Sequence, residues 1–290
     1  MAESEVENGL SKEAIEAVRQ WRQGDYTLDF PAFPSGQLDE KGYDAEMEEV
    51  AGWVVISQTC DIVNIGKGDR HHVVVAPLVK LENEKKLEDT NVGATPSTAP
   101  LEHPPSPQHV VDLTMATTIQ KATLAKLKRH DGFRTEIGRA KFGRRLERRY
   151  GRFAFPDALN PTLGAIRDQS KSKHNKESDQ GRIYRSIYGF RVAASPNFDV
   201  EKPTIRIIAV LEDEDAMEAT RAEIIAELKT LEDAPKFKWP AAFSKATPLF
   251  VASNRDEITA RQWELSMPVD LDYLSEPPMP EPGSEPGDAV

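Results

Sequence analysis

A single cysteine, Cys60, stands directly before Asp61 at the end of an apolar stretch that begins at Gly52. A thiol can act as a nucleophile, and a carboxylate can act as a general base or a metal ligand. Two adjacent histidines, His71 and His72, follow shortly after and could supply the base that a cysteine nucleophile needs. Cys60, Asp61, His71 and His72 are therefore the candidate catalytic residues.

A structural role is open for each of these groups. A lone cysteine beside an apolar strand is commonly a small buried hydrophobic residue, and a neighbouring carboxylate disfavours the thiolate through like charge. Asp61 could bind a metal together with Asp69 or a histidine, but it could equally form a turn. No P-loop, dinucleotide-binding glycine motif or His-Glu-x-x-His sequence occurs. We therefore predict neither a metal nor a cofactor.

The second candidate site is a row of cations in a segment, residues 135–153, whose apolar residues follow a helical period. The cations at helical spacing are Lys141, Arg145, Arg148 and Arg152. From residue 121 to residue 152 there are twelve Lys or Arg against three acids, a local charge of +9. Such a row could contact several phosphates of a nucleic acid. A solvated helix face, or docking onto the chain's own acidic parts, would explain the same pattern.

Charge and composition limit the classes of function. The 290-residue chain has a net charge of −11, and residues 1–50 hold thirteen acids against four bases. An acidic surface of this kind could bind a protein partner. No apolar run reaches the length of about 20 residues that a membrane span needs, and the acidic amino terminus does not resemble a signal peptide. One cysteine is compatible with a reducing compartment, so we expect a cytoplasmic protein without a membrane partner.

Strands and helices must position these groups. Alternation or apolar runs predict strands over residues 25–30, 52–56, 72–81 and 109–114, and Pro77 predicts an edge or a bulge in the third of them. Ser11 is the expected N-cap of a first helix. In the second half, strands are expected over 183–194, 204–211 and 248–253, with a helix over 216–231 that completes a β-α-β unit. Residues 34–49 and 167–182 are expected to be loops because they are polar.

Several short pieces of the first half resemble the PemK/MazF toxin family. They are Gly24-Asp25 opening a strand, Trp53 to Ser57, Val73 to Pro77, Pro107 to Val111 and Thr118 to Leu124. The resemblance implies an SH3-like barrel and, in that family, metal-independent RNA cleavage. The family's arginine before the second strand has no counterpart in Val50-Ala51-Gly52-Trp53, which puts the cleavage chemistry in doubt. The segment Ser57 to Asp61 is also similar to an uncharacterised bacterial group with a Ser-His/Gln-x-Cys-Asp motif.

The sequence thus predicts an α+β protein with an SH3-like barrel, a helical connector and a second α/β domain. The expected boundaries are an N-terminal helix in 1–23, the barrel in 24–130, a basic helical connector in 131–165, the α/β domain in 166–275 and a disordered tail in 276–290. The leading hypothesis is a nucleic-acid-binding protein of toxin-related or phage-defence type that prefers RNA to DNA, with endonuclease activity as an open extension of this hypothesis. The alternatives are a hydrolase that uses Cys60 and Asp61, and an adaptor that binds a protein through its acidic surface or its tail.

Overall fold

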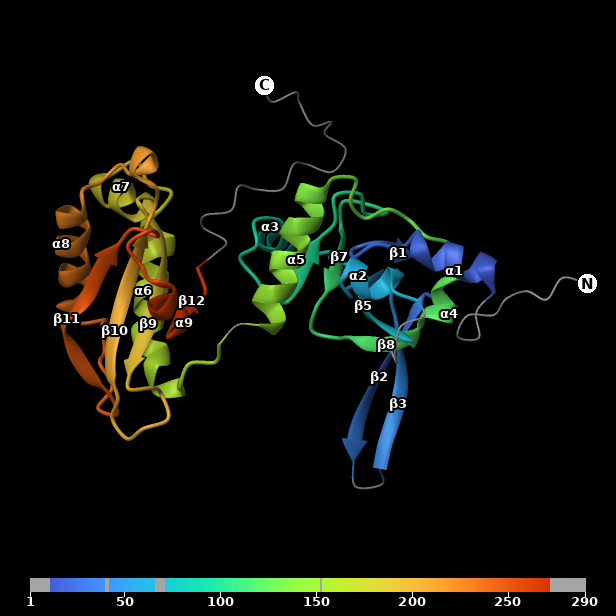
Figure 1. Ribbon diagram of the computed structural model, residues 1–290, viewed down its shortest axis with the longest axis horizontal. Helices are drawn as coiled ribbons and strands as arrows, with labels where there is room; N and C mark the ends of the chain where they lie inside the picture. Colours follow the sequence, from blue (N-terminus) through green and yellow to red (C-terminus); the bar gives the residue numbers. More distant parts are fainter. Residues whose placement is uncertain (1–10, 40–41, 66–70, 152, 272–290) are drawn as a thin grey trace, which may run out of the picture. The chain divides into compact units, whose positions relative to one another are not determined.

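The computed structural model describes residues 11–39, 42–65, 71–151 and 153–271. The chain forms two compact units that meet in the sequence after Gly151, and each has its own hydrophobic core (Figure 1). Helices and strands mix in both units, so the prediction of an α+β protein is confirmed. Among the helices in these residues, none is long and apolar enough to cross a bilayer.

The main sheet of the first unit is antiparallel. Its strands are β1 (Tyr26–Thr27), β4 (Gly52–Val55), β5 (His72–Lys80), β6 (Thr98–Pro100), β7 (His109–Asp112) and β8 (Thr117–Gln120). They follow the order β1-β4-β5-β7-β6, and β8 pairs with β5 off this path. The path has open ends at β1 and β6, so the described strands do not form the closed barrel that the PemK/MazF resemblance implies.

Strand β5 is the centre of this sheet rather than an edge. Its first half, from His72 to Val75, pairs with β8, and its last three residues pair with β7. Pro77 lies between the residues of β5 that pair with β8 and those that pair with β7, so neither of these two strands is paired with it. On the other side of β5, Pro77 is opposite Trp53 of β4. A proline without an N–H is tolerated there because no ladder bond is lost.

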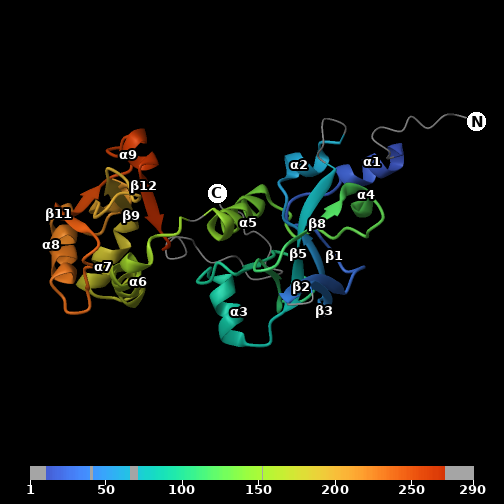
Figure 2. The same ribbon diagram turned by 90° about the horizontal axis from the view of Figure 1, so that it is seen from below.

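Five helices cover this sheet in the described part of the first unit: α1 (Lys12–Arg19), α2 (Thr59–Val63), α3 (Glu84–Asn91), α4 (Lys121–Leu124) and α5 (Glu136–Tyr150). Ser11 caps α1 as predicted, since its hydroxyl accepts a hydrogen bond from the N–H of Ala14. Helices α1 and α4 lie side by side (Figures 1 and 2). Phe142 and Leu146 of α5 are buried in the core of the first unit, so this helix is part of that unit and not of a separate connector.

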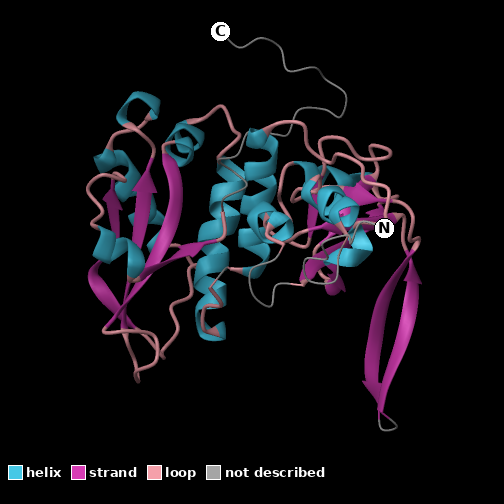
Figure 3. Ribbon diagram, turned by 45° about the vertical axis from the view of Figure 1, so that its right-hand side comes forward, coloured by secondary structure: helices cyan, strands magenta, loops and turns pink. Residues whose placement is uncertain are grey.

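Strands β2 (Ala32–Asp39) and β3 (Gly42–Glu49) form an antiparallel hairpin where a loop was expected. Among the described strands they pair only with each other, and Figures 1 and 3 show the hairpin standing apart from the rest of the first unit. Its base is anchored because the indole N–H of Trp53 donates to the carbonyl of Ala32 at 2.8 Å. The ring of Phe33 also packs edge-on against Trp53, with 6.0 Å between the ring centroids.

The second unit is a four-stranded sheet with helices. The strands β9 (Ile187–Ser195), β10 (Thr204–Leu211), β11 (Ser244–Ser253) and β12 (Ser266–Val269) follow the order β11-β10-β9-β12. Strands β10 and β11 are parallel and are joined through α8 (Arg221–Glu232), which is the predicted β-α-β unit. The second unit also contains the helices α6 (Asn160–Lys173), α7 (Asp179–Arg185) and α9 (Ala260–Glu264) and two short 3-10 turns, η1 (Asp157–Leu159) and η2 (Glu214–Ala216).

Helix α6 occupies much of the segment that was predicted to be an exposed loop, so that prediction is wrong. Leu163, Ile166 and Ser170 recur along one face and are buried, whereas Arg167 and Asp168 between them are exposed. Figure 2 shows α6, α7 and α8 on one side of the sheet and α9 on the other. The expected tail, residues 276–290, lies outside the described residues.

Candidate functional site

Cys60 lies in the first turn of α2, directly after β4 as the sequence indicated, and its side chain is exposed. Its Sγ lies 3.6 Å from Oε1 of Gln58. Hydrogen bonds from the turn before β1 and from β5 fix this turn: the N–H of Gln23 donates to the hydroxyl of Thr59 at 3.1 Å, and the N–H of Val74 donates to that of Ser57 at 2.8 Å. The exposed thiol contradicts the alternative of a buried hydrophobic cysteine.

Lys121 ties the Cys60-Asp61 helix to the strand that begins at His72. Its ammonium group donates to the carbonyl of Asp61 and, at 2.8 Å, to that of Asn64. Its own N–H donates to the carbonyl of His71 at 2.8 Å. Buried to 2% exposure, Lys121 is therefore a structural cation and is not available to a ligand.

The four candidate catalytic residues thus lie on two linked segments, but they do not form a nucleophile–base pair in the described structure. His71 and His72 are exposed, and the hydrogen bonds found for Cys60 within the described ranges do not include either ring. Asp69 lies outside the described residues. A cysteine nucleophile needs a base within hydrogen-bond reach, so the geometry does not assemble this chemistry.

The cations of α5 do not form the exposed row that their spacing predicted. Arg145 and Arg148 are buried, with 7% and 8% of their surface exposed. Arg148 donates to the carbonyl of Gly93, and the guanidinium of Arg145 fills the space beside Gly93 where a side chain would otherwise stand. Gly93 has a φ of +74°, so the backbone also favours glycine there. The prediction of an exposed row is therefore wrong for these two residues.

The other members of the row add little. Lys141 is only half-buried, and Arg152 lies outside the described residues. The exposed face of α5 carries Ile137, Ala140, Arg144 and Glu147, which mixes apolar, basic and acidic groups. The helix turns its arginines inward because the loop after α3 covers the face beside its apolar stripe. A continuous basic surface is therefore not present on this helix.

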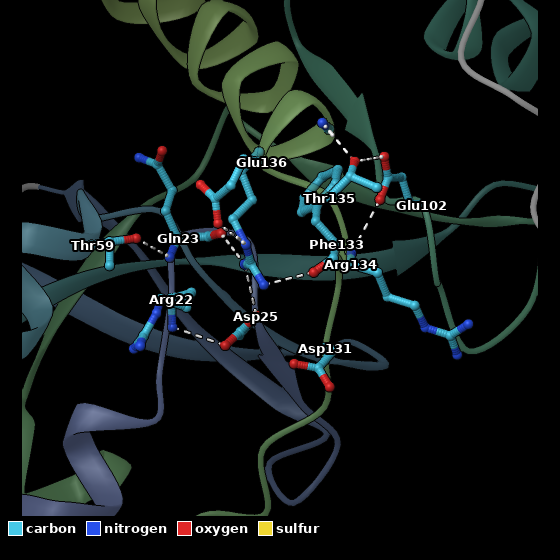
Figure 4. Close-up of polar contacts among 12 residues, drawn as sticks. Arg22, Gln23, Asp25, Thr59, Glu102, Asp131, Phe133, Arg134, Thr135 and Glu136 are labelled. Atoms are coloured by element: carbon cyan, nitrogen blue, oxygen red, sulfur yellow. Dashed lines mark hydrogen bonds and ion pairs between the residues drawn. The ribbon is translucent and has the colours of Figure 1, made fainter. Parts of the chain in front are cut away.

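Other cations of the basic segment are neutralised inside the first unit by Asp25, which is fully buried. Its carboxylate accepts from Arg129 at 2.8 Å and from Arg139 at 3.1 Å. It also accepts from the backbone N–H of Arg22 at 2.8 Å, as Figure 4 shows. Burial has the largest single effect on the pKa of Arg129 and lowers it, but the hydrogen bonds and charges of Asp25 and Asp131 together leave this pKa raised. Asp25 joins the start of the sheet to α5, which is a structural role.

A second carboxylate fixes the start of α5. Glu102 accepts from the hydroxyl of Thr135 at 3.0 Å and from the N–H of Arg134 at 3.2 Å (Figure 4). Thr135 is itself the N-cap, since its hydroxyl accepts from the N–H of Gly138. The sequence named Asp25 only as part of the resemblance and gave no role to Asp25 or Glu102, because the arginine partners of Asp25 and the Thr135 partner of Glu102 are distant in the sequence.

The β2–β3 hairpin presents a different kind of surface, which we call the hairpin surface and define as Pro34, Asp44, Glu46, Met47 and Glu48. All five residues are exposed, and Met47 has 61% of its surface exposed. Side chains alternate between faces along a strand, so the three acids share one face, and Met47 with its cross-strand partner Pro34 occupies the other. The sequence predicted the acidity of this region but not its strand structure.

In the second unit the polar groups serve its own architecture. Glu223 closes the capping box of α8 with Thr220 and accepts from Arg182 at 2.6 Å. The bond from Arg182, followed by those from Thr220, lowers the pKa of Glu223 to about 2. Tyr184 is buried, and burial raises the pKa of its hydroxyl. Burial likewise raises the pKa of Glu212. These shifts follow from packing and helix capping.

Within the residues that the structure describes, no group of three or more His, Cys, Asp or Glu is placed to hold a metal ion. Comparison of the chain with protein-family models, with curated proteins and with solved structures gives no match in any of the three. The PemK/MazF resemblance therefore stays a prediction, and function is inferred from geometry alone.

Proposed function

We propose that this protein is an adaptor that binds a protein partner through the hairpin surface of its first unit. The observation that supports this is a hairpin that pairs with no other described strand and that exposes Met47 on one face and three carboxylates on the other. An isolated two-stranded hairpin is marginally stable in water, so a long one that leaves the body of the protein gains stability from a partner.

The adaptor is better supported than the two other hypotheses. Arg145 and Arg148 of α5 cannot contribute to RNA binding as they stand, because they lie against Gly93 instead of facing solvent. A cysteine hydrolase retains an exposed thiol but has no histidine within hydrogen-bond reach in the described structure. The hairpin surface is exposed as it stands and requires no rearrangement to make a contact.

A photo-crosslinking amino acid placed at position 47 tests the proposal in the cells that make the protein. We expect a discrete adduct with another protein, whose purified form then binds the wild-type chain. Position 137 is the matched control, because Ile137 is apolar and even more exposed, at 71% against 61% for Met47. The same set of adducts from both positions would indicate nonspecific contact and would contradict the proposal.

A further inference from the structure

The outer edge of β3 is open along its length. Strand β3 pairs with β2 in a continuous register from Ala32 with Glu49 to Asp39 with Gly42, and no other described strand lies beside it. In an antiparallel pair, alternate residues point their N–H and C=O groups away from the partner strand. These groups form a template for a further strand. The inner strand β2 is less open, because Trp53 already occupies the carbonyl of Ala32.

The side chains on β3 indicate the charge of the strand that would pair there. Asp44, Glu46 and Glu48 lie on one face, spaced about 7 Å apart by the rise of a strand. Their cross-strand neighbours are Gln37, Ser35 and Phe33, none of which is a cation. Among the ion pairs between described residues, none involves these three acids. No cation of the described residues therefore compensates their charge across the hairpin.

The opposite face of the hairpin sets a second, independent requirement for the side chains of a strand that would pair with β3. Met47 and Pro34 are neighbours there, and both are exposed. A strand added beside β3 places its own alternate residues next to Met47, so apolar residues at those positions would cover it. A segment that alternates cationic and apolar residues satisfies both faces at once.

On the basis of the proposed function, we propose that the partner contributes an extended basic segment, with lysine or arginine at alternate positions and apolar residues between them, which adds as a third strand to the outer edge of β3. Strand addition takes its affinity from main-chain hydrogen bonds and its selectivity from alternate side chains. The cations then face Asp44, Glu46 and Glu48, and the apolar residues cover Met47.

The test uses the full chain and a fluorescent synthetic peptide of alternating lysine and valine, with a peptide of the same composition in which the lysines form one block. We expect the alternating peptide to bind at least about tenfold more tightly, since several cross-strand pairs each contribute a few-fold. Hydrogen exchange should also slow at alternate amides of β3 in the complex. Equal binding of the two peptides, binding without that protection, or no binding overturns the proposal.

A triple variant, Asp44→Asn with Glu46→Gln and Glu48→Gln, keeps the shapes of the side chains and removes their charge. It should weaken binding of the alternating peptide by about tenfold. Glu49→Gln is the control, because Glu49 is exposed on the other face of the same strand and should leave affinity unchanged. Equal losses in the triple variant and the control would overturn the proposal.

Two further outcomes separate this proposal from the one on which it rests. If light scattering shows a dimer of the wild-type chain that the triple variant abolishes, then the occupant of the edge is a second copy and the basic partner is wrong. If position 47 crosslinks to a defined protein but the alternating peptide does not bind, then the adaptor function stands and strand addition by a basic segment falls.

Discussion

At the scale of single residues, the charges with the largest structural effect are those that the fold buries. Asp25 has no exposed surface. Its carboxylate forms ion pairs with Arg129 and Arg139 and accepts a hydrogen bond from the backbone N–H of Arg22. Removing one partner of a buried ionic group leaves an uncompensated charge, which costs more than the pair contributes. The basic segment therefore stabilises the first unit through these arginines, and its local excess of charge is a poor indicator of a binding surface.

Asp25→Asn is expected to destabilise the first unit by about 3 kcal/mol, because two guanidinium groups lose their counter-charge in a buried site. Urea unfolding followed by circular dichroism measures this change. Asp131→Asn is the matched control: Asp131 also pairs with Arg129, but 52% of its side chain is exposed, so the expected loss is below about 1 kcal/mol. Similar losses for both variants would show that burial does not govern this site.

Cys60 is expected to react fully with iodoacetamide in the native protein, because its side chain is exposed. The labelled fraction can be measured by intact mass spectrometry before and after denaturation. A thiol that is modified only after denaturation would contradict the exposed position. The hydrolase hypothesis requires more, namely labelling faster than that of free cysteine, since a catalytic thiol must be activated by a base.

At the scale of elements, N-terminal caps fix where helices α8 and α5 begin. Helix α8 begins at a capping box in which Thr220 and Glu223 exchange hydrogen bonds, and Arg182 of α7 adds an ion pair to the same carboxylate. Helix α5 begins at Thr135, which Glu102 holds from a separate segment. Each cap satisfies N–H groups that a helix start leaves without partners, and in both cases it also links two elements.

Glu223 makes the stability of the second unit depend on pH. Its pKa in the folded protein, about 2, is below the usual value of 4.5, so its contribution is complete above pH 4.5 and is lost as the pH falls toward about 2. Glu223→Gln is expected to lower the thermal midpoint at neutral pH, with a difference from wild type that shrinks across this window. Glu214→Gln, at an exposed acid nearby, should change little at any pH. A constant difference across the window would contradict the assignment.

The outer part of the hairpin should be removable without unfolding the first unit. Phe33 is buried at its base, whereas the residues from Pro34 to Glu49 whose exposure is described contribute no buried side chain. Replacing residues 35–46 by a short turn is therefore expected to leave the thermal midpoint of the first unit nearly unchanged. The same deletion should abolish the adduct formed from position 47. Loss of the cooperative transition would instead assign the hairpin a role in the fold.

At the scale of the whole molecule, two separate cores divide the chain. The clusters around Val54 and Trp53 lie wholly before Gly151, and the cluster around Ile166 and Ile207 lies wholly after it. A unit with its own core can fold by itself, and the boundary between such units falls where few contacts cross. The hairpin surface belongs entirely to the first unit, so partner binding should not require the second.

Fragments 1–151 and 153–277 are each expected to unfold cooperatively when they are expressed alone. Their two urea transitions should together reproduce that of the full chain, because each core is complete in one fragment. Circular dichroism of the three proteins provides the comparison, and limited proteolysis should cut near residue 152. A fragment that is unfolded alone but folded in the full chain would show that the units depend on each other.

The sequence by itself determined the elements whose signals are local. Ser11 at the start of α1, the apolar strand β4 and the β10-α8-β11 unit follow from caps and periodicity, which depend on residues only a few positions apart. Only the tertiary structure decided which charges are buried. Asp25 and Arg139 are 114 residues apart, and Arg148 meets Gly93 across 55 residues, so no local pattern could show that these cations were already engaged. A helical row of arginines has the same sequence pattern whether it faces solvent or is covered by a loop. Here the loop after α3 packs against the row, and this packing buries Arg145 and Arg148.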